Sequence, residues 1–392
     1  MIYLDNNATT RMSDQVLEEM LPFLREDYGN ASSIQHKLGR RAHQAVEQAR
    51  ERVAQALRVD TKEIFFTSGA TEAINTVLKG VYQRYQAKGR HIITSPAEHK
   101  AVLTVCEQLR GEGAEVTYLS VNAQGLIDTD ELKRSIREDT VLVCLMAANN
   151  ETGVLAPLGD IAAICRQKDV LFFCDATQYI GKLGIDLSQE PIDMLCLSAH
   201  KFHGPKGIGA LYVRRKSKPT QIASLIQGGK QEHGFRGGTY AVAPIVGLGA
   251  ALKEIEQNDA EYIRELRDQF EQLVMQEIAE TKVHGSEAPR LYNTSNILFK
   301  HVRGAELMTK LPDVAISSGS ACVSGDRDPS HVLKAMGISD EDALCSLRFS
   351  FSKYNTREEV VEVVAKLKAA VEKLRAESPI WQMYKAGLLD EL

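Results

Sequence analysis

The sequence predicts an α/β protein built on a mainly parallel β-sheet, followed by a smaller α+β part. Three observations support this prediction. Short apolar stretches alternate with longer amphipathic stretches between residues 64 and 213, as strands and crossover helices do in a parallel sheet. Most of the short stretches are apolar throughout, which is typical of strands covered on both faces. A chain of 392 residues is also long enough for a second domain beside the first.

The expected elements follow one another in a regular order after an extended arm at the start of the chain. Amphipathic periodicity with polar residues at the starts predicts the helices. These are residues 14–24, 39–57, 71–87, 100–112, 128–138 and 158–167. Apolar runs bounded by turn residues predict the strands. These are residues 64–67, 91–95, 116–120, 141–147, 170–174, 194–197 and 210–213.

The pattern changes near Gly249, where long charged helical stretches at 250–280 follow the last apolar strand of the first part. Beyond them the sequence predicts three strands and a final helix, at residues 295–299, 314–317, 346–350 and 356–377. We therefore expect a large domain at residues 1–250 and a small α+β domain at residues 251–392. We expect the N-terminal arm, residues 1–30, to pack on the small domain.

Charge and hydropathy argue against two classes of partner. The net charge is −5, and no basic run or basic stripe with interleaved aromatic residues stands out, so nucleic acid is not an expected partner. The N-terminus has no basic segment followed by an apolar core, and no apolar run approaches the length of a membrane span. We therefore expect no membrane association and a cytoplasmic protein.

The seven cysteines form no C-x-x-C pair and no zinc-like spacing, so no metal site is predicted. Their odd number and scattered positions suit reduced thiols in a reducing compartment. Most of them lie in apolar segments, where a buried cysteine is an ordinary small hydrophobic residue. Cys322 is different because it lies in a stretch rich in glycine and serine, residues 317–325.

Polar residues that follow the predicted strands indicate where a site would lie, because ligands bind beyond the carboxyl ends of parallel strands. Lys201 comes after the buried strand 194–197 and before a loop rich in glycine and proline, residues 204–209. A lysine there has rigid support and open space, which suits an amine that attacks a carbonyl group. A lysine on a surface turn is an equally good interpretation of this stretch alone.

Other chemically useful residues follow neighbouring strands. Residues 68–72 begin a helix, where free N–H groups can bind a phosphate, although an ordinary helix cap is the more common use of serine and threonine there. His99, the polar cluster 149–153, Asp175 and Gln178 follow other strands. These groups together suit pyridoxal phosphate, because one edge of the sheet would hold an amine, a carboxylate, a histidine and a helix N-terminus that can bind a phosphate.

Several motifs resemble the class V aminotransferases and, among them, the cysteine desulfurases of the NifS/IscS type. The motifs are Ser-Ala-His-Lys-Phe-His-Gly-Pro-Lys-Gly-Ile-Gly at 198–209, Asp-Ala-Thr-Gln at 175–178 and Tyr-Leu-Asp-Asn-Asn-Ala-Thr-Thr at 3–10. The resemblance extends from Tyr3 to Tyr384. It implies the aspartate aminotransferase-like fold of pyridoxal-phosphate-dependent transferases (fold type I), with a mainly parallel sheet of the seven-stranded type.

The most informative motif surrounds Cys322. Its serines and glycines predict a hydrophilic, exposed loop, and an exposed reactive thiol is normally avoided unless it is used. In the family this loop carries the nucleophilic cysteine, so the resemblance implies that Cys322 forms a persulfide. It also implies that Cys322 transiently contacts an iron–sulfur cluster on a partner, with no metal site of the protein's own.

The resemblance implies roles around the cofactor ring. Lys201 is expected to form the Schiff base with pyridoxal phosphate and Asp175 to hold the pyridine nitrogen. Gln178 is expected to donate a hydrogen bond to the ring oxygen. His99 is expected to stack on the ring and to shuttle protons. Arg348 is expected to bind the substrate carboxylate, for which a planar guanidinium is well suited.

The remaining implied roles concern the phosphate and the neighbouring subunit. Asn150 is expected to lie between cofactor and substrate. Thr239 is expected to reach the phosphate of the neighbouring subunit, which implies a homodimer with shared sites. The residues expected to contact the phosphate within one subunit are Ala70, Thr71, Ser198 and His200.

Two segments depart from the family pattern. Residues 30–33 read Asn-Ala-Ser-Ser where the family usually has Asn-Pro-Ser-Ser, which reduces the rigidity of the loop. Lys230, His233 and Gly237 replace residues that are usual around the contact between subunits. These changes put the strength of phosphate binding in question, although Arg236 and Thr239 are retained.

The implied activity is the removal of sulfur from L-cysteine, which leaves L-alanine and passes sulfur to an iron–sulfur scaffold protein or another sulfur carrier. The tail 378–384, with the only tryptophan, resembles the scaffold-docking end of the family, and a packing anchor is an equally good interpretation.

Three alternatives to a cysteine desulfurase share some of these features. A selenocysteine lyase and a class V transaminase use the same fold. A transaminase has no use for the Cys322 loop, whereas the sequence leaves selenocysteine activity open. A non-catalytic scaffold is a different class of protein, and the joint presence of Lys201, Asp175, His99 and Cys322 argues against it.

Overall fold

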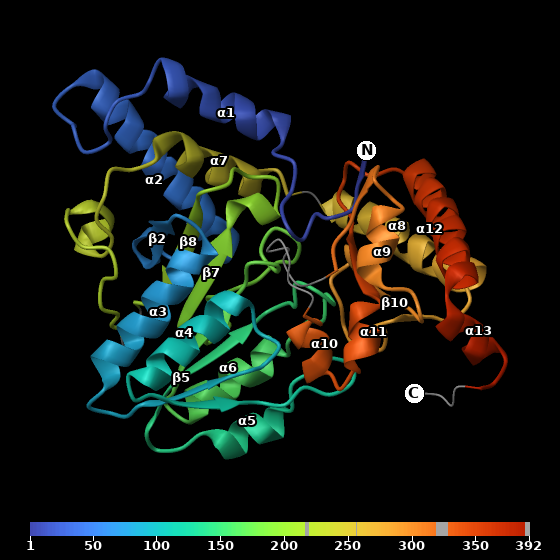
Figure 1. Cartoon of the computed structure of the whole chain (residues 1–392). Helices are drawn as coiled ribbons and strands as arrows, with labels where there is room; N and C mark the ends of the chain where they lie inside the picture. The colour runs from blue at the N-terminus through green and yellow to red at the C-terminus, as the bar shows by residue number, and fades with distance from the viewer. Residues whose placement is uncertain (216–218, 256, 319–327, 389–392) are drawn as a thin grey trace.

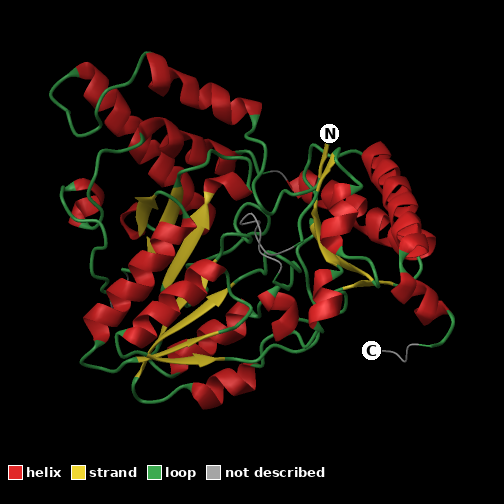
Figure 2. Ribbon diagram, in the orientation of Figure 1, coloured by secondary structure: helices red, strands yellow, loops and turns green. Residues whose placement is uncertain are grey.

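The computed structural model describes residues 1–215, 219–255, 257–318 and 328–388. Figure 1 shows two parts side by side: a larger one, in which helices surround a sheet, and a smaller one built mostly from the last third of the chain. The N-terminus lies on the smaller part (Figure 1). Figure 2 shows the strands of the larger part enclosed between helices, as the sequence predicts for a sheet with two apolar faces.

A seven-stranded sheet forms the centre of the larger part, in the order β2-β8-β7-β6-β5-β3-β4. Strand β8 pairs antiparallel with both of its neighbours, and the other pairings are parallel. The strands are β2 (Ile64–Thr67), β3 (His91–Thr94), β4 (Glu115–Tyr118), β5 (Thr140–Met146), β6 (Leu171–Asp175), β7 (Met194–Ser198) and β8 (Gly209–Val213). The prediction of an α/β fold with a mainly parallel sheet is confirmed.

Helices cover both faces of this sheet. They are α1 (Asp14–Arg25), α2 (Lys37–Leu57), α3 (Ala70–Tyr85), α4 (Lys100–Gly111), α5 (Thr129–Ser135), α6 (Leu158–Gln167) and α7 (Val242–Lys253). Along β5, Val143 and Leu145 join the apolar core that holds α2, α6 and α7, whereas Leu142 and Cys144 join the core that holds α3 and α4. The strand is therefore apolar on both faces, which explains its uninterrupted hydrophobic sequence.

The smaller part has a sheet in the order β12-β10-β9, with antiparallel pairings. Helices α8 (Gln257–Glu277) and α12 (Arg357–Glu377) pack against it around a separate core, in which the ring of Phe270 contacts Phe349 and Phe351. Its strands are β9 (Thr281–Val283), β10 (Thr294–Phe299) and β12 (Ser346–Ser350), and β1 (Ile2–Tyr3) pairs with β11 (Val314–Ala315). Its short helices are α9 (Gly304–Thr309), α10 (His331–Ala335), α11 (Asp340–Leu344) and α13 (Pro379–Lys385).

Two details of the predicted domain organisation need correction. Residue 250 falls inside α7, which packs in the core of the larger part, so the change of core comes after the end of α7 at Lys253. Of the N-terminal arm, Ile2 and Leu4 enter the core of the smaller part. Helix α1 instead packs on the larger part, because its apolar residues Val16 and Met20 lie in that core. None of the described helices is long and apolar enough to cross a membrane.

Candidate active site

The sheet topology gathers the predicted residues at one edge. Strands β2, β3, β5, β6 and β7 run in the same direction, so the residues at their carboxyl ends meet there. Charge interactions confirm that several are close: the carboxylate of Asp175 and the amine of Lys201 both act on His99, and the guanidinium of Arg348 acts on Lys201. Arg348 comes from β12 of the smaller part, so both parts contribute to the site.

Lys201 ends a short 3-10 helix, η2 (Ala199–Lys201), that follows β7 directly. Its amine, Nζ, donates hydrogen bonds of 2.7 Å to the carbonyl oxygens of Asn7 and Ala8 in the N-terminal arm. Burial of the amine, together with the nearby Arg348 guanidinium, lowers the pKa of Lys201 to about 8. A lysine with this pKa is partly neutral near physiological pH, which a nucleophilic amine requires.

Asp175 is the last residue of β6 and is buried. Its Oδ1 accepts hydrogen bonds from the backbone N–H of Thr177 at 3.0 Å and from the thiol of Cys196 at 3.5 Å. Gln178 follows in the next turn and is also buried. Its side-chain nitrogen donates to the carbonyl oxygen of Asn7 at 2.9 Å, and its side-chain oxygen accepts from the amine of Lys182 at 3.1 Å.

His99 caps the N-terminus of α4. Its Nδ1 accepts a hydrogen bond of 3.1 Å from the backbone N–H of Ala101, so the proton of the neutral ring is on Nε2. Desolvation lowers the pKa of His99, although the negative charge of Asp175 opposes this effect. The ring is therefore largely neutral at pH 7 and presents an N–H that can donate a proton.

The N-terminus of α3 has the features of a phosphate site. Its cap is Gly69, and no side chain caps the helix within the described residues, so the first N–H groups, at Ala70 and Thr71, remain available to an anion. Gly69 has a φ of +141°. A Cβ placed on Gly69 would lie 3.5 Å from the hydroxyl oxygen of Ser198. Gly209 in β8 lies so close to Gly69 that a Cβ placed on Gly209 would be 2.8 Å from the Cα of Gly69.

His200 lies beside Lys201 and is held by the hydroxyl of Thr9, 3.1 Å from its Nδ1. Desolvation, and then the positive charge of Lys201, lower the pKa of His200 to about 4. The ring is neutral at pH 7. It can therefore contact an anion as a hydrogen-bond donor but not as a cation.

Arg348 lies in β12 and is 4% exposed. One guanidinium nitrogen donates to the carbonyl oxygen of Asn150 at 3.0 Å and another to the carboxylate of Asp5 at 2.7 Å. Its Nε is buried and has no hydrogen-bond partner among the described residues. A buried guanidinium with a free N–H is suited to a carboxylate that binds along its side.

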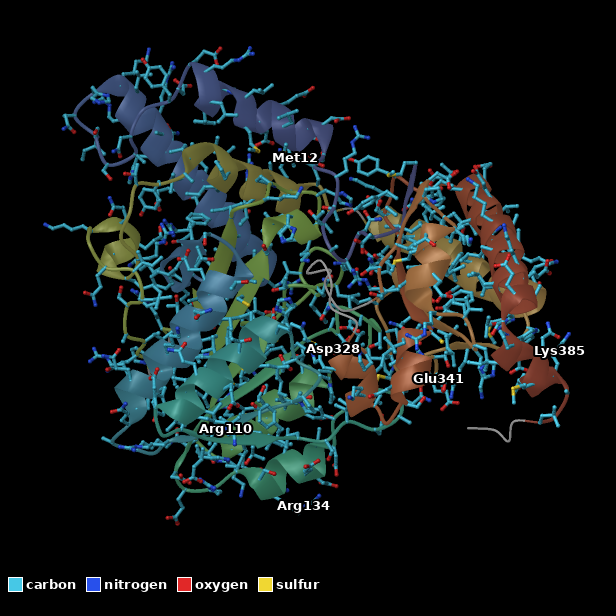
Figure 3. All side chains as sticks on the ribbon, in the orientation of Figure 1. Met12, Arg110, Arg134, Asp328, Glu341 and Lys385 are labelled. Atoms are coloured by element: carbon cyan, nitrogen blue, oxygen red, sulfur yellow. The ribbon has the colours of Figure 1, made fainter. Side chains whose placement is uncertain are left out.

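Cys322 lies outside the described residues, but both neighbouring segments are attached to the site. The backbone of Ser317 exchanges hydrogen bonds with Arg348, at 2.7 and 3.3 Å. On the other side, Asp328 lies between the two parts in Figure 3. The hydroxyl of Ser330 then donates to the carboxylate of Glu151 at 2.5 Å. The described residues on the two sides, Ser317 and Ser330, thus contact Arg348 and Glu151.

Thr239 is exposed, and no hydrogen bond joins it to the cluster within the described part of the single chain. Three residues earlier, the guanidinium of Arg236 forms a bidentate ion pair with Glu72 in the first turn of α3. Of the departures, Lys230 directly precedes a tight turn, η3 (Gln231–Gly234), and His233 lies within it. The role expected of Thr239 in a neighbouring subunit remains a prediction.

Several residues around the site were not singled out from the sequence. Asn7 and Asp5 belong to the arm motif, which carried the resemblance without a role for each residue. Glu98, which precedes His99 in the chain, is fully buried, and desolvation raises the pKa of its carboxyl group well above the ordinary value. Nothing in the sequence distinguishes Glu98 from a helix-start residue. Lys182, four positions after Gln178, looks like an ordinary surface lysine in the sequence.

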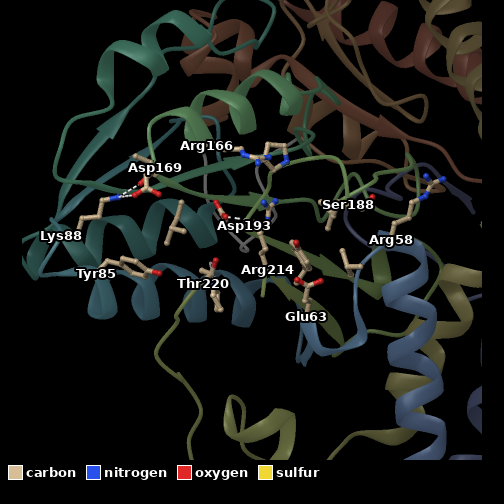
Figure 4. A pocket seen from close by; sticks show the side chains of 17 residues that line it. Arg58, Glu63, Tyr85, Lys88, Arg166, Asp169, Ser188, Asp193, Arg214 and Thr220 are labelled. Carbon is tan, nitrogen blue, oxygen red and sulfur yellow. Dashed lines mark hydrogen bonds and ion pairs between the residues drawn. The ribbon is translucent and has the colours of Figure 1, made fainter. Parts of the chain in front are cut away.

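A different cavity, of about 450 Å³, lies at the opposite edge of the sheet (Figure 4). Its basic residues include Arg58, Lys88 and Arg214. Arg58 pairs with Asp186, Lys88 donates to the backbone of Asp169, and Arg214 donates to backbone carbonyl oxygens. These three cations already have partners, whereas the Nε of Arg348 at the carboxyl edge has none in the part of the chain that the structure describes.

The donor set at the carboxyl edge fits pyridoxal phosphate. Lys201 supplies a partly neutral amine for the aldehyde, Asp175 a buried carboxylate for the ring nitrogen, and the uncapped start of α3 a place for the phosphate. Each is an ordinary feature alone. Their meeting at one edge fulfils the three separate requirements of this cofactor.

The chain is similar to proteins of known family over nearly its whole length. Residues 2–363 match the family model described as aminotransferase class-V. The chain is 48% identical over 391 residues to "Cysteine desulfurase IscS" of Histophilus somni (strain 129Pt), covering 99% of this chain and 96% of that protein. It is 47% identical to the protein of the same name from Mannheimia succiniciproducens, with the same coverage.

Solved structures give a consistent result. A structure described as "NIFS-LIKE PROTEIN" superposes with a TM-score of 0.87 at 40% identity, covering 95% of this chain and 99% of that one. Another, described as "SspA in complex with cysteine", superposes with a TM-score of 0.81 at 37% identity, covering 91% of this chain and 100% of that one. The expected resemblance is therefore confirmed by comparison of both sequence and structure.

Proposed function

Because the chain belongs to the class V aminotransferase family, we propose that it is a cysteine desulfurase with pyridoxal phosphate as its cofactor. It removes sulfur from L-cysteine and forms L-alanine and a persulfide on its own Cys322. The observation that carries this proposal is that the Lys201 amine and the Arg348 guanidinium lie close enough to interact and contact the same N-terminal arm. An amino acid has a group for each of them, an amine on Cα and a carboxylate.

Arg348 binds and orients the substrate. Its free Nε–H and the second hydrogen of a neighbouring guanidinium nitrogen can hold both oxygens of the carboxylate. Asp5 and Asn150 hold the guanidinium in place from the other side, so little side-chain entropy is lost on binding. The carboxylate is thereby fixed close to Lys201.

The cofactor is held by Lys201, by Asp175 at its ring nitrogen and by the N-terminus of α3 at its phosphate. When bound, pyridoxal phosphate supplies an electron sink for the carbon that loses a proton. Lys201 removes the proton from Cα, because its lowered pKa of about 8 leaves part of the amine neutral. Asn7 and Ala8 hold the same amine through their carbonyl oxygens whenever it is free.

His99 and Cys322 complete the transfer of sulfur. His99 holds a proton on Nε2 and can give it to the substrate as the carbon–sulfur bond breaks. The thiolate of Cys322 attacks the substrate sulfur, so that a sulfur–sulfur bond forms as the bond between Cβ and sulfur breaks. The products are alanine and one persulfide for each cysteine consumed.

We further propose a homodimer in which Thr239 reaches the phosphate of the neighbouring subunit, and a location in the cytoplasm. The persulfide then passes to an iron–sulfur scaffold protein or another sulfur carrier. The attachment of both ends of the Cys322 segment to Arg348 and Glu151 supports a segment that works at the site. The names of the relatives support the sulfur chemistry.

Incubation of the purified protein, loaded with pyridoxal phosphate, with L-cysteine tests the proposal. We expect alanine and protein-bound persulfide in equal amounts before a reductant is added.

Cys322→Ser should keep the yellow colour of the bound cofactor and lose persulfide formation, because the cofactor contacts lie elsewhere. Normal sulfur release by Cys322→Ser would disprove the assigned nucleophile, and the absence of alanine with the wild-type protein would disprove the activity. Selenocysteine as a second substrate measures the selectivity for sulfur.

A further inference from the structure

Lys182 lies next to the candidate active site but has no role in the chemistry described so far. Its amine donates a hydrogen bond of 3.1 Å to the side-chain oxygen of Gln178 and one of 3.3 Å to the carbonyl oxygen of Lys201. It therefore contacts the residue expected at the cofactor's ring oxygen and the main chain of the lysine that holds the cofactor. Both contacts come from a single amine.

The turn after β6 directs Lys182 toward this position. Residues 176–183 form successive turns closed by backbone hydrogen bonds, including those from Lys182 and Leu183 to Tyr179. Gly181 has a φ of +85°, and a Cβ on it would lie 2.2 Å from the Cβ of Phe202. The turn can pack against the segment after η2 only because this position is glycine.

The two hydrogen bonds of Gln178 fix the orientation of its amide. In its protonated form the amine of Lys182 can only donate, so the side-chain atom that faces it must then be the amide oxygen. The carbonyl oxygen of Asn7 can only accept, so the atom 2.9 Å away must be the amide nitrogen. The second N–H of Gln178 is then left for another acceptor. With the amide reversed, both existing contacts would become repulsive.

The amine of Lys182 is held there at an energetic cost. Desolvation, and then the positive charge of Lys201, lower the pKa of Lys182 to about 7. Within the described residues, no ion pair with a carboxylate compensates the desolvation of the Lys182 amine. The neighbouring imidazoles of His200 and His203 have pKa values lowered to about 4 by burial, so they stay neutral and add no charge. A desolvated lysine without a counter-ion is uncommon and indicates a use for the amine.

The stem of Lys182 also lines a cavity of about 600 Å³ between the two cores. The other charged residues in its wall are Arg58, Glu254, Asp259 and Lys353. Lys353 lies 3.6 Å from Asp259 and 4.0 Å from Glu254, so these carboxylates already have a cationic neighbour. The amine of Lys182 instead donates toward Gln178 and η2.

From this geometry we infer that Lys182 is a positioning residue, which holds the Gln178 amide with its nitrogen toward the cofactor and ties that amide to the main chain of Lys201. The inference rests on the proposed function, because it takes the ring oxygen of pyridoxal phosphate as the acceptor for the second N–H of Gln178. Lys182 does not touch the reacting atoms. It acts only through Gln178 and the backbone of η2.

A double-mutant cycle on cofactor binding tests the inference without relying on turnover. Lys182→Met keeps the length of the side chain and removes its donors. We expect it to raise the apparent dissociation constant of pyridoxal phosphate from the apoprotein roughly three- to tenfold, the value of one lost hydrogen bond. It should also shift the pH at which the absorbance of the bound cofactor changes. In a Gln178→Ala background, Lys182→Met should have a clearly smaller effect on both quantities, because only the hydrogen bond to the carbonyl oxygen of Lys201 is then left to lose.

Two controls separate positioning from a merely structural role. Lys182→Arg keeps a donor and should retain the wild-type dissociation constant within about twofold. Lys168→Met removes an exposed lysine after α6 and should change neither quantity. If Lys182→Met does not fold, the comparison of Lys182→Gln with Lys182→Arg replaces it, and the inference requires weaker cofactor binding by the glutamine variant.

The outcomes are distinguishable. Equal binding and equal spectra in Lys182→Met and wild type would overturn the inference, as would additive effects of Lys182→Met and Gln178→Ala. A wild-type protein that binds the cofactor but yields no alanine from L-cysteine would instead overturn the proposed function. In that case the double-mutant cycle on cofactor binding would still test the role of Lys182.

Discussion

At the scale of single residues, the environment of Lys201 determines the pH at which its amine can react. Burial and the Arg348 guanidinium together outweigh the attraction of Asp175 and Asp5, so the pKa falls from 10.5 to about 8. Only the neutral amine attacks an aldehyde. The rate at which the apoprotein attaches pyridoxal phosphate should therefore rise with pH to a plateau, with a midpoint near pH 8. Stopped-flow absorbance after mixing apoprotein and cofactor measures this rate.

Lys201→Ala is the control for that measurement and should show no absorbance of a cofactor joined to lysine at any pH. A midpoint near 10.5 in the wild-type protein would show that the amine is not desolvated as the structure indicates. An unchanged spectrum in Lys201→Ala would show that another lysine forms the bond to the cofactor.

Arg348→Lys should weaken the binding of L-cysteine more than it slows the chemistry. Lysine keeps the positive charge but loses the planar pair of donors, so one charge-assisted hydrogen bond to the carboxylate is lost. We expect KM to rise roughly 10- to 100-fold with a smaller change in kcat. Steady-state kinetics measures both. Arg357→Lys, at an exposed residue of α12, is the matched control, and an unchanged KM in Arg348→Lys would exclude the carboxylate role.

The residues of the site were predictable where the chemistry is local. Asp175 ends the buried strand β6, and Lys201 and His99 follow the buried strands β7 and β3 within a few residues, so their expected positions follow from the order of the strands. Glu98 and Lys182 were not predictable, because their importance arises from burial and from partners distant in sequence. The raised pKa of Glu98 depends on packing that no local pattern of residues reveals.

At the scale of elements, the N-terminal arm connects the two parts through Asn7. Its side chain donates to the carbonyl oxygen of Asn150 at 3.1 Å and to the hydroxyl of Thr294 at 2.9 Å, and accepts from the side chain of Asn293 at 3.1 Å. Its own carbonyl oxygen accepts from Lys201 and Gln178. One buried residue of the arm therefore touches residues of both parts, including the amine of Lys201.

Asn7→Ala should lower the free energy of unfolding by about 1–3 kcal/mol, because it leaves buried hydrogen-bonding groups without a partner. Denaturation of the apoprotein with urea measures this change. Asn122→Ala removes a side chain from an exposed turn and should cost less. Equal losses in the two variants would show that the arm does not hold the two parts together.

Among the elements, those with a clear apolar or amphipathic pattern were predicted well, and short helices without such a pattern were not. The sequence indicates β2 and α6 with the residues that the structure gives them, because apolar pattern and turn residues agree there. Helix α5 is shorter than predicted, since the chain leaves the helix at Ile136 and turns into β5. The short helices α10 and α11 were missed because they depend on serine caps and tertiary contacts rather than on a periodic pattern.

At the scale of the whole molecule, the two parts were foreseen, but the way they join was not. The boundary at residue 250 followed from a change in composition, and α7 crosses it because its residues are apolar on all sides and buried in the larger part. The return of Ile2 and Leu4 to the smaller core is a long-range contact, and a local pattern carries no information on it. The same holds for the attachment of Ser317 to Arg348.

The proposed sharing of sites between two subunits is testable by mixing two inactive variants. Lys201→Ala lacks the amine, and Thr239→Glu places a negative charge where the partner's phosphate is expected, so that cofactor binding is weakened by repulsion.

If Thr239 acts in the neighbouring subunit, a mixed dimer has one site with Lys201 from one chain and Thr239 from the other, both intact. Random mixing of equal amounts then restores roughly a quarter of the wild-type activity, because half of the dimers are mixed and each has one good site. Alanine formation after unfolding and refolding the mixture together measures the recovery. If Thr239 instead serves its own subunit, every site in the mixture has a defect and no activity returns.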